Sequence, residues 1–488
     1  MNPLLMTDGY KANHRQMYPE GTQMVYSNYT ARSVKYMPDA AKDVVVFGIQ
    51  YTMKYIDEMF KIHFFNQPKE AVCSEFQEYM ESYLGLPYDV SQFEALHDLG
   101  HLPIVVKALD EGTIIPEKIP MMTIHNTDED FFWVTNYLET LISSLLWKPV
   151  HSASMALGYR RILTKWAKKT DEKNLGFVDY QMHDFSFRGM QHPEAAISSG
   201  LGFLTCARGT DTIPTLWAAM HYYGTENAGN SVTATEHSVM SAGGKESEMD
   251  TFSRLLKTFP TGILSVVSDT WNLWRVLTDY LPQLKEQILA RDGKLVIRPD
   301  SGDPVDIICG KVRKMSMRGH QYDAECKGVI ELLWDVFGGT INEQGYKILD
   351  PHISAIYGDS ISLERAEQIS QRLEAKGFAT TNVVYGIGSF SMGYATRDSQ
   401  GGAVKSTAVM NNGEIIPITK EPITDDGTKK SAKGLLRVDK IDGVYVLKNE
   451  CTIEESDGGL LTPVYVNGKF TNIQTLTRIR DLIIKQLN

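Results

Sequence analysis

Short apolar segments alternate with longer mixed segments through the middle of the chain, and this pattern sets the predicted architecture. Runs rich in Val, Ile and Leu return at intervals long enough to hold a helix. A repeated strand with a helical crossover predicts a parallel sheet. The predicted strands lie at 178–185, 203–211, 263–269, 295–300, 353–359 and 383–389, with a segment around Glu236 and His237 between the second and the third.

Polar residues follow most of these apolar runs. Functional side chains at the carboxyl ends of successive parallel strands are typical of a βα barrel. An open doubly wound sheet also binds ligands at these ends, and it remains the alternative. We favour an α/β fold with a βα barrel over residues 151–400, because no Rossmann fingerprint with a following acidic residue is visible.

The two flanking regions have different patterns. Residues 1–150 contain predicted strands at 44–51 and 102–109 and predicted helices at 53–60 and 134–147. Residues 401–488 alternate between apolar and polar positions. They are interrupted by the pairs Asn412-Gly413, Asp426-Gly427, Asp442-Gly443 and Asn467-Gly468, and each pair favours a hairpin turn. The C-terminal segment is therefore predicted to consist largely of antiparallel strands.

The amino-acid composition argues against several classes of protein. The chain has 488 residues, 42% of them hydrophobic and 22% charged, and no apolar run is long enough to span a bilayer. The five cysteines are scattered without a CxxC spacing, which favours a reducing cytoplasm over disulfides or a zinc site. The N-terminus does not resemble a secretory signal. A net charge of −11 disfavours nucleic acid as a partner, so any anion site must be local.

The residues at the predicted strand ends point to a phosphorylated sugar as the ligand. Arginines bind phosphate through two hydrogen bonds, glycine turns offer backbone N–H groups, and carboxylates hold Mg²⁺ or ribose hydroxyls. His237 can accept a proton or a phosphoryl group, although a single histidine is more often structural. The set comprises Arg188, Asp211, His237, Asp269, Arg298, Asp300, Asp303, Asp359 and the turn at 386–388.

Several basic residues gather in the C-terminal segment of this acidic chain. Solvated loop lysines and a phosphate-facing loop are both open interpretations. The set comprises Lys405, Lys420, Lys429, Lys430, Lys433 and Arg437.

Eight motifs, spread in order over nearly the whole chain, resemble those of the nicotinamide phosphoribosyltransferases, which are type II phosphoribosyltransferases. They are DGYK at 8–11, HDFSFRG at 183–189, GTDT at 209–212, EHS at 236–238, VVSD at 266–269, IRPDSG at 297–302, YGD at 357–359 and TRD at 396–398. The sequence departs from the glycine-richest members after Gly388, where Ser389 and Phe390 follow.

The resemblance implies an irregular βα barrel and a second α+β domain formed from both chain termini. It implies that nicotinamide and phosphoribosyl pyrophosphate give nicotinamide mononucleotide and pyrophosphate, with ATP and Mg²⁺ as cofactors. It also implies a homodimer in which each active site borrows residues from the other subunit. No nucleic acid and no membrane is involved in this activity.

The resemblance also implies roles for individual residues. His237, which ATP should phosphorylate, is catalytic together with Asp269 and Asp300, and these two aspartates lie near Mg²⁺. The implied substrate-binding residues are Tyr10 of the partner subunit, Phe185, Arg188, Asp211, Arg298, Gly358, Asp359, Gly388 and Ser389. The implied phosphate-binding residues are Arg397 and Lys405, with Arg32, Lys420 and Lys429 from the partner subunit.

Three other functions remain as alternatives. Nicotinate phosphoribosyltransferase has the same chemistry, but a carboxylate at Asp211 would repel the carboxylate of nicotinate. A barrel glycosidase could use two of the aspartates, yet the arginines and the glycine turn have no task on a neutral sugar. A regulatory protein could keep the pocket without catalysing a reaction.

Overall fold

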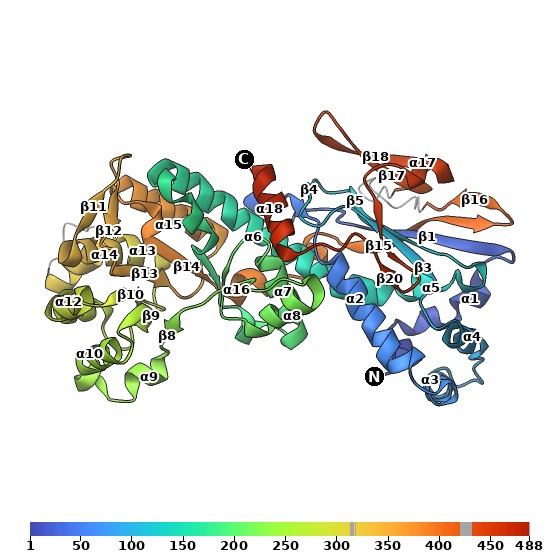
Figure 1. Ribbon diagram of the computed structural model, residues 1–488, viewed down its shortest axis with the longest axis horizontal. Helices are drawn as coiled ribbons and strands as arrows, with labels where there is room; N and C mark the ends of the chain where they lie inside the picture. Colours follow the sequence, from blue (N-terminus) through green and yellow to red (C-terminus); the bar gives the residue numbers. More distant parts are fainter. Residues whose placement is uncertain (313–316, 318, 420–431, 488) are drawn as a thin grey trace. The chain divides into compact units, whose positions relative to one another are not determined.

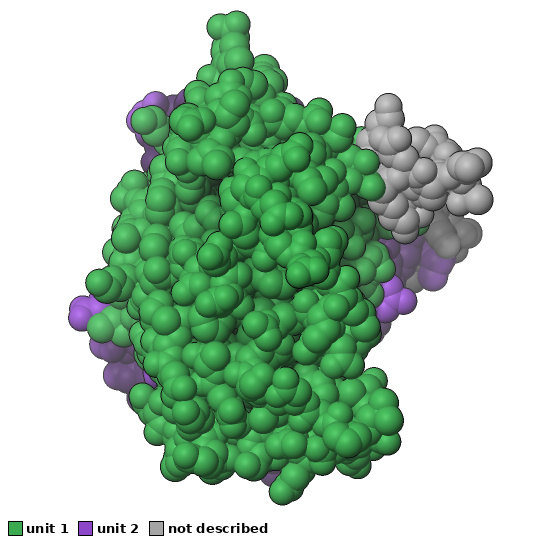
Figure 2. Space-filling model, turned by 90° about the vertical axis from the view of Figure 1, so that its right-hand side faces the viewer, with its two compact units in different colours: residues 1–154, 218–225, 395–488 green, residues 155–217, 226–394 purple. Residues whose placement is uncertain are grey.

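The chain folds into two compact units, which are coloured separately in Figure 2. The computed structural model describes residues 1–312, 317, 319–419 and 432–487. Unit 1 contains Met1–Ser154, Ala218–Thr225 and Ala395–Asn488, and unit 2 contains Met155–Trp217 and Glu226–Tyr394. Both ends of the chain therefore contribute to unit 1, while the middle of the chain forms unit 2.

Unit 1 is built on a seven-stranded sheet in which every neighbouring pair is antiparallel. Its order is β16 (Glu414–Pro417), β15 (Ala403–Asn411), β1 (Thr22–Thr30), β5 (Pro120–Asn126), β3 (Ile104–Ala108), β19 (Thr462–Val466) and β20 (Lys469–Phe470). The N-terminal strand β1 pairs with the C-terminal strand β15 along its whole length. Strands from the two ends of the chain are thus neighbours in one sheet.

The hairpin turns of unit 1 have the backbone that their sequences predict. Asn412-Gly413, Asp442-Gly443 and Asn467-Gly468 all have positive φ at both residues, as type I′ turns require. Asp442-Gly443 joins β17 (Leu435–Ile441) to β18 (Val444–Cys451) in a separate two-stranded sheet. The predicted turn at Asp426-Gly427 lies outside the described residues.

Two N-terminal predictions need correction. The predicted strand at 44–51 is only β2 (Val44–Val45), because Gly48 turns the chain with φ +88 and α2 (Ile49–Phe60) starts at once. Glu111 stabilises this helix start by accepting a hydrogen bond from the Gln50 N–H at 2.7 Å. The predicted helix at 134–147 is α5 (Val134–Tyr137) followed by α6 (Glu139–Thr170), which continues through Pro149.

Unit 2 contains a seven-stranded parallel sheet (Figure 1). Its order is β7 (Gly209–Thr210), β6 (Met182–Asp184), β14 (Val383–Ile387), β13 (Ile353–Tyr357), β10 (Asp292–Arg298), β9 (Thr261–Val267) and β8 (Thr233–Ala234). An isolated parallel bridge joins Gly209 of β7 to Asn230, just before β8. The two ends of the sheet meet there, so the predicted irregular barrel is confirmed.

Helices between the strands complete unit 2. They are α7 (Pro193–Phe203), the first part of α8 (Ile213–Tyr223), whose residues from Ala218 onward belong to unit 1, α10 (Glu248–Thr258), α12 (Leu281–Leu289), α13 (Pro304–Cys309), α14 (His320–Phe337) and α15 (Leu363–Ala375). The predicted strand at 203–211 is wrong over most of its length, because Phe203 ends α7 and only Gly209 and Thr210 are extended. An apolar run of this length does not by itself distinguish a buried helix end from a strand.

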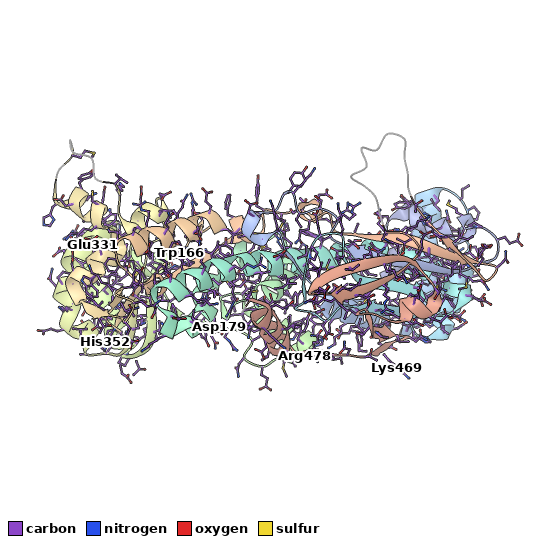
Figure 3. All side chains as sticks on the ribbon, turned by 90° about the horizontal axis from the view of Figure 1, so that it is seen from above. Trp166, Asp179, Glu331, His352, Lys469 and Arg478 are labelled. Atoms are coloured by element: carbon purple, nitrogen blue, oxygen red, sulfur yellow. The ribbon has the colours of Figure 1, made fainter. Side chains whose placement is uncertain are left out.

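Asp179, labelled in Figure 3, fixes the entry into two barrel strands. Its carboxylate binds Arg160 of α6 at 2.6 Å, and its carbonyl accepts the Arg208 N–H just before β7.

No helix in the described part of the chain is long and apolar enough to cross a membrane.

Candidate active site

The predicted residues of unit 2 lie at the carboxyl ends of the barrel strands, which we call the rim. Because parallel strands end at the same edge of a sheet, residues far apart in sequence become neighbours there. The rim residues are Phe185 after β6, Asp211 after β7, His237 after β8, Asp269 after β9, Arg298 and Asp300 at the end of β10, Gly358 and Asp359 after β13, and Gly388 and Ser389 after β14.

Asp269 connects three segments of the rim. Its Oδ2 accepts the Asp300 N–H at 2.9 Å, the Ser301 N–H at 2.7 Å and the Ser301 hydroxyl at 2.5 Å. Its Oδ1 lies 3.4 Å from Nε2 of His237, the first residue of α9 (His237–Ser241). The carboxylate can therefore fix the orientation of the His237 ring while holding the turn after β10.

Arg298 and Phe185 form a cation–π pair beside this carboxylate. The guanidinium carbon lies 4.8 Å from the centre of the Phe185 ring, and Nη2 lies 3.8 Å from Oδ2 of Asp300. Burial raises the pKa of Asp300, although the charge of Arg298 opposes this effect. A flat aromatic ring, a cation and a carboxylate are thus gathered at one point of the rim.

Gly386 was predicted to belong to a phosphate-binding turn, but the structure gives it a different role. Gly386 and Ile387 belong to β14, so the predicted turn at 386–388 begins only at Gly388. A Cβ on Gly386 would lie 2.7 Å from Cδ2 of Phe185, too close for any side chain. Gly386 therefore makes room for the Phe185 ring.

His183 contacts both Asp211 and the Phe185 ring. His183 Nε2 is 2.8 Å from Oδ1 of Asp211, and the His183 ring is 4.7 Å from the Phe185 ring. Burial acts to raise the pKa of Asp211, but hydrogen bonds from His183 and Ser231 outweigh it and lower this pKa below its usual value. Asp211 is therefore an ionised acceptor at neutral pH.

The short segments that carry Arg188 and Ser389 are close neighbours on the rim. Arg188 is in the short 3-10 helix Phe187–Gly189, and a side chain on Gly189 would collide with the Ser389 hydroxyl. The Asp359 carboxylate accepts the Ser360 hydroxyl at 2.7 Å. The two strand ends after β6 and β14 are therefore packed together.

The remaining predicted residues are in unit 1 or outside the described residues. Tyr10 is 63% exposed in the short 3-10 helix Gly9–Asn13, and Arg32 donates through Nε to the Gly401 carbonyl at 2.8 Å. Arg397 lies 3.5 Å from Asp398, and Lys405 is an exposed residue of β15. The structure does not describe Lys420 and Lys429.

Two buried oxygens on the rim fit a divalent cation. Oδ1 of Asp269 and Oδ1 of Asp300 are buried and have no hydrogen-bond partner in the described structure. Mg²⁺ commonly takes one or two carboxylates and completes its shell with water and substrate phosphates. Among the described residues, no group of three or more His, Cys, Asp or Glu side chains could hold a metal by itself. The two carboxylates therefore suit a Mg²⁺ ion that arrives with a phosphorylated substrate.

His183, Ser231 and Ser301 take part in these contacts although they had no predicted role. For His183 a signal existed: it precedes Phe185 by two positions on a strand, and such residues lie on the same face. Ser231 and Ser301 reach carboxylates 20 and 32 positions away, which only the fold could bring together.

Two family models match the chain. Residues 180–455 match the nicotinate phosphoribosyltransferase (NAPRTase) family, and residues 2–105 match the nicotinamide phosphoribosyltransferase N-terminal domain. The chain is 45% identical over its full length to a nicotinamide phosphoribosyltransferase of Acinetobacter baylyi, covering 98% of that protein. It is 33% identical to a nicotinamide phosphoribosyltransferase of Xanthomonas campestris pv. campestris, over 98% of this chain and 97% of that protein.

Solved structures share the fold at low sequence identity. Human nicotinic acid phosphoribosyltransferase is similar with a TM-score of 0.59 and 17% identity, over 99% of this chain and 93% of that chain. The nicotinate-nucleotide pyrophosphorylase of Pyrococcus furiosus has a TM-score of 0.55 and 15% identity, over 99% and 95%.

Proposed function

Because the chain belongs to the nicotinate phosphoribosyltransferase family, we propose that it transfers a phosphoribosyl group to nicotinamide in NAD salvage. The products are nicotinamide mononucleotide and pyrophosphate. The observation that carries the choice of nicotinamide is the Asp211 carboxylate, which His183 binds at 2.8 Å while its ring packs against Phe185. A carboxamide N–H can donate to this carboxylate, whereas the carboxylate of nicotinate would be repelled.

The pyridine ring binds by stacking. Phe185 offers one aromatic face near the Arg298 cation, and offset stacking on a flat ring stabilises the complex by about 0.5–1.5 kcal/mol beyond the area buried. The exposed Tyr10 of a second subunit supplies the other face, which makes the homodimer part of the proposal. Asp211 receives the carboxamide and so sets the rotation of the ring about its stacking axis.

The reaction needs no proton transfer at the nucleophile. The lone pair of the pyridine nitrogen forms a bond to the anomeric carbon, and the bond from that carbon to the pyrophosphate oxygen breaks with its electron pair. Positive charge develops on the ribose, where the Asp300 and Asp359 carboxylates lie, and negative charge leaves with pyrophosphate. Arg188, Arg397 and Lys405 hold phosphates in this proposal, and catalysis consists mainly of positioning and charge stabilisation.

Asp269 and Asp300 would hold Mg²⁺ through their unpartnered Oδ1 atoms. The ion, when bound, neutralises negative charge on pyrophosphate. Asp269 keeps its Oδ2 on the Asp300 and Ser301 N–H groups throughout, so the turn after β10 stays in place.

We propose that ATP phosphorylates His237. A ring nitrogen attacks the γ-phosphorus, and ADP leaves with the electron pair of the broken P–O bond. The negative charge of Asp269, whose Oδ1 lies 3.4 Å from Nε2, favours the tautomer with its proton on Nε2 and leaves Nδ1 free to attack. The all-thiol state of the five cysteines supports a cytoplasmic setting for this chemistry.

Mass detection of the product tests the proposed function. Purified protein is given phosphoribosyl pyrophosphate and Mg²⁺ with either nicotinamide or nicotinate, with and without ATP. We expect nicotinamide mononucleotide and a large preference for the amide. Asp211→Asn should reduce that preference by about 2–4 kcal/mol, since it removes the charge that excludes nicotinate.

Asp250→Asn serves as the matched control, because Asp250 is an exposed residue of α10 and makes none of the rim contacts described above. It should keep the wild-type preference. Preferential formation of nicotinate mononucleotide by the wild type would contradict the proposal and establish the alternative, nicotinate phosphoribosyltransferase.

A further inference from the structure

We propose that His183 is the positioning residue that makes Asp211 selective for the carboxamide, by holding one carboxylate oxygen and directing the other to the substrate. This inference rests on the proposed function, because it concerns how the same site tells nicotinamide from nicotinate. It adds a residue that touches both groups on which the pyridine substrate depends, the Phe185 ring and the Asp211 carboxylate.

The His183 ring has little freedom to leave this position. The residue is in β6, with its side chain 10% exposed, and its ring packs against Phe185 on one side. On another side it meets the backbone of β7, where a Cβ on Gly209 would lie only 2.7 Å from Nδ1. Gly209 thus allows the imidazole to lie close to the strand that carries Asp211. The Nε2–H points at Asp211 because the packing of the ring against Phe185 and β7 fixes its direction.

Both available donors converge on the same oxygen of Asp211. His183 Nε2 reaches Oδ1 at 2.8 Å, and the Ser231 hydroxyl reaches it at 2.5 Å. A carboxylate oxygen has two lone-pair directions, so these donors fill Oδ1. In the described structure no donor reaches Oδ2. The substrate therefore finds a single free acceptor, and two donors on one oxygen resist rotation of the carboxylate.

This arrangement explains selectivity better than the presence of a carboxylate alone. A protonated Asp211 could donate a hydrogen bond to the carboxylate of nicotinate, and nicotinate could then bind. The donors His183 and Ser231 counter the effect of burial and keep the pKa of Asp211 low, so the free Oδ2 carries negative charge and no proton. An amide N–H is stabilised at Oδ2, and the carboxylate of nicotinate is repelled there.

A matched pair of variants tests the inference. His183→Gln keeps an N–H donor at nearly the position of Nε2, whereas His183→Met has similar length and no donor. The measured quantity is kcat/KM for nicotinamide divided by kcat/KM for nicotinate. We expect His183→Met to lower this ratio by about tenfold or more, mainly through a higher KM for nicotinamide, and His183→Gln to restore most of it. An equal fall in both variants would indicate a packing role and overturn the proposal.

A double-mutant cycle separates this inference from the proposed function. In the Asp211→Asn background, His183→Met should leave the ratio unchanged, because the carboxylate it positions is gone. An enzyme that makes no nucleotide from either substrate would contradict the proposed function. A wild type that prefers nicotinamide, paired with a His183→Met variant that keeps the full preference, would overturn only the role of His183.

Ser231→Ala provides a second route if His183→Met folds poorly. Ser231 is exposed, so its truncation leaves the core intact, and it removes the other donor from the same Oδ1. We expect a smaller fall in the ratio, about threefold, because one neutral hydroxyl is lost. An unchanged ratio would show that the occupation of Oδ1 does not govern selectivity.

Discussion

Replacing Gly386 by alanine should weaken nicotinamide binding without unfolding the chain. Gly386 is inside β14 and has no left-handed φ, so its backbone suits alanine. The new Cβ would lie 2.7 Å from Cδ2 and 2.8 Å from Cε2 of Phe185, and 2.8 Å from the Tyr357 carbonyl oxygen. The carbonyl belongs to the neighbouring strand β13, so relief of both contacts requires a small shift of the β14 backbone as well as displacement of the Phe185 ring.

The size of the effect follows from that displacement. Ordinary van der Waals contact begins at 3.4 Å, so the ring must retreat by about 0.7 Å. Overpacking of this kind costs about 1–3 kcal/mol of folding stability, which a large barrel can tolerate. Because a 1 Å misplacement of a binding group can cost about 100-fold, we expect kcat/KM for nicotinamide to fall by about 10- to 50-fold. The KM for nicotinamide should carry most of this change.

The assay measures kcat and KM for nicotinamide and for phosphoribosyl pyrophosphate, together with the melting temperature. Gly176→Ala is the matched control, because nothing lies within 4 Å of its Cβ position and its φ is ordinary. It should match the wild type in every measurement. A folded Gly386→Ala enzyme with the nicotinamide KM of the control would refute the stacking role of Phe185.

Three further predictions concern other groups. The His237→Ala variant should no longer take up acid-labile phosphate from labelled ATP. It should keep some ATP-independent synthesis, because the nucleophile is the nitrogen of the substrate. Label that persists in this variant would show that another residue is phosphorylated. Tyr10→Ala and Arg298→Ala homodimers should both be nearly inactive. A co-folded mixture should regain about a quarter of wild-type activity, because in each mixed dimer one of the two active sites contains neither substitution. A mixture that stays inactive despite subunit exchange would show that both residues serve one subunit's site. Burial raises the pKa of Glu248 from 4.5 to about 7, so the folded chain binds more protons than the unfolded chain in this interval and stability falls as pH rises through it. Glu248→Gln should therefore raise the melting temperature more at about pH 8 than at about pH 5, and an equal rise at both would contradict the assignment.

The sequence by itself determined the parts of this protein that depend on local spacing. The Asn-Gly and Asp-Gly pairs at 412–413, 442–443 and 467–468 interrupt alternating apolar and polar runs and favour positive φ, so these hairpin turns could be predicted. The apolar runs at 263–269, 353–359 and 383–389 mark strands because burial on both faces requires apolar residues. The polar residues after these runs lie at the rim because parallel strands all end at the same edge of the sheet.

Only the tertiary structure decided which rim residues touch each other. The order β7-β6-β14-β13-β10-β9-β8 is not the order of the chain, and apolar periodicity does not encode it. That order brings β6 beside β7, and with it His183 against Asp211. It also brings β14 beside β6, so that Gly386 packs against Phe185 and not in a phosphate turn.

The division into two units also depends on contacts between residues that are far apart in the sequence. Residues 218–225 form part of unit 1, where Tyr223 donates to Glu111 at 2.9 Å and Thr225 accepts the Leu476 N–H at 2.8 Å. These partners lie 112 and 251 positions away in the sequence. A hydrogen bond between such distant residues depends on the whole fold, because each partner by itself is an ordinary polar residue.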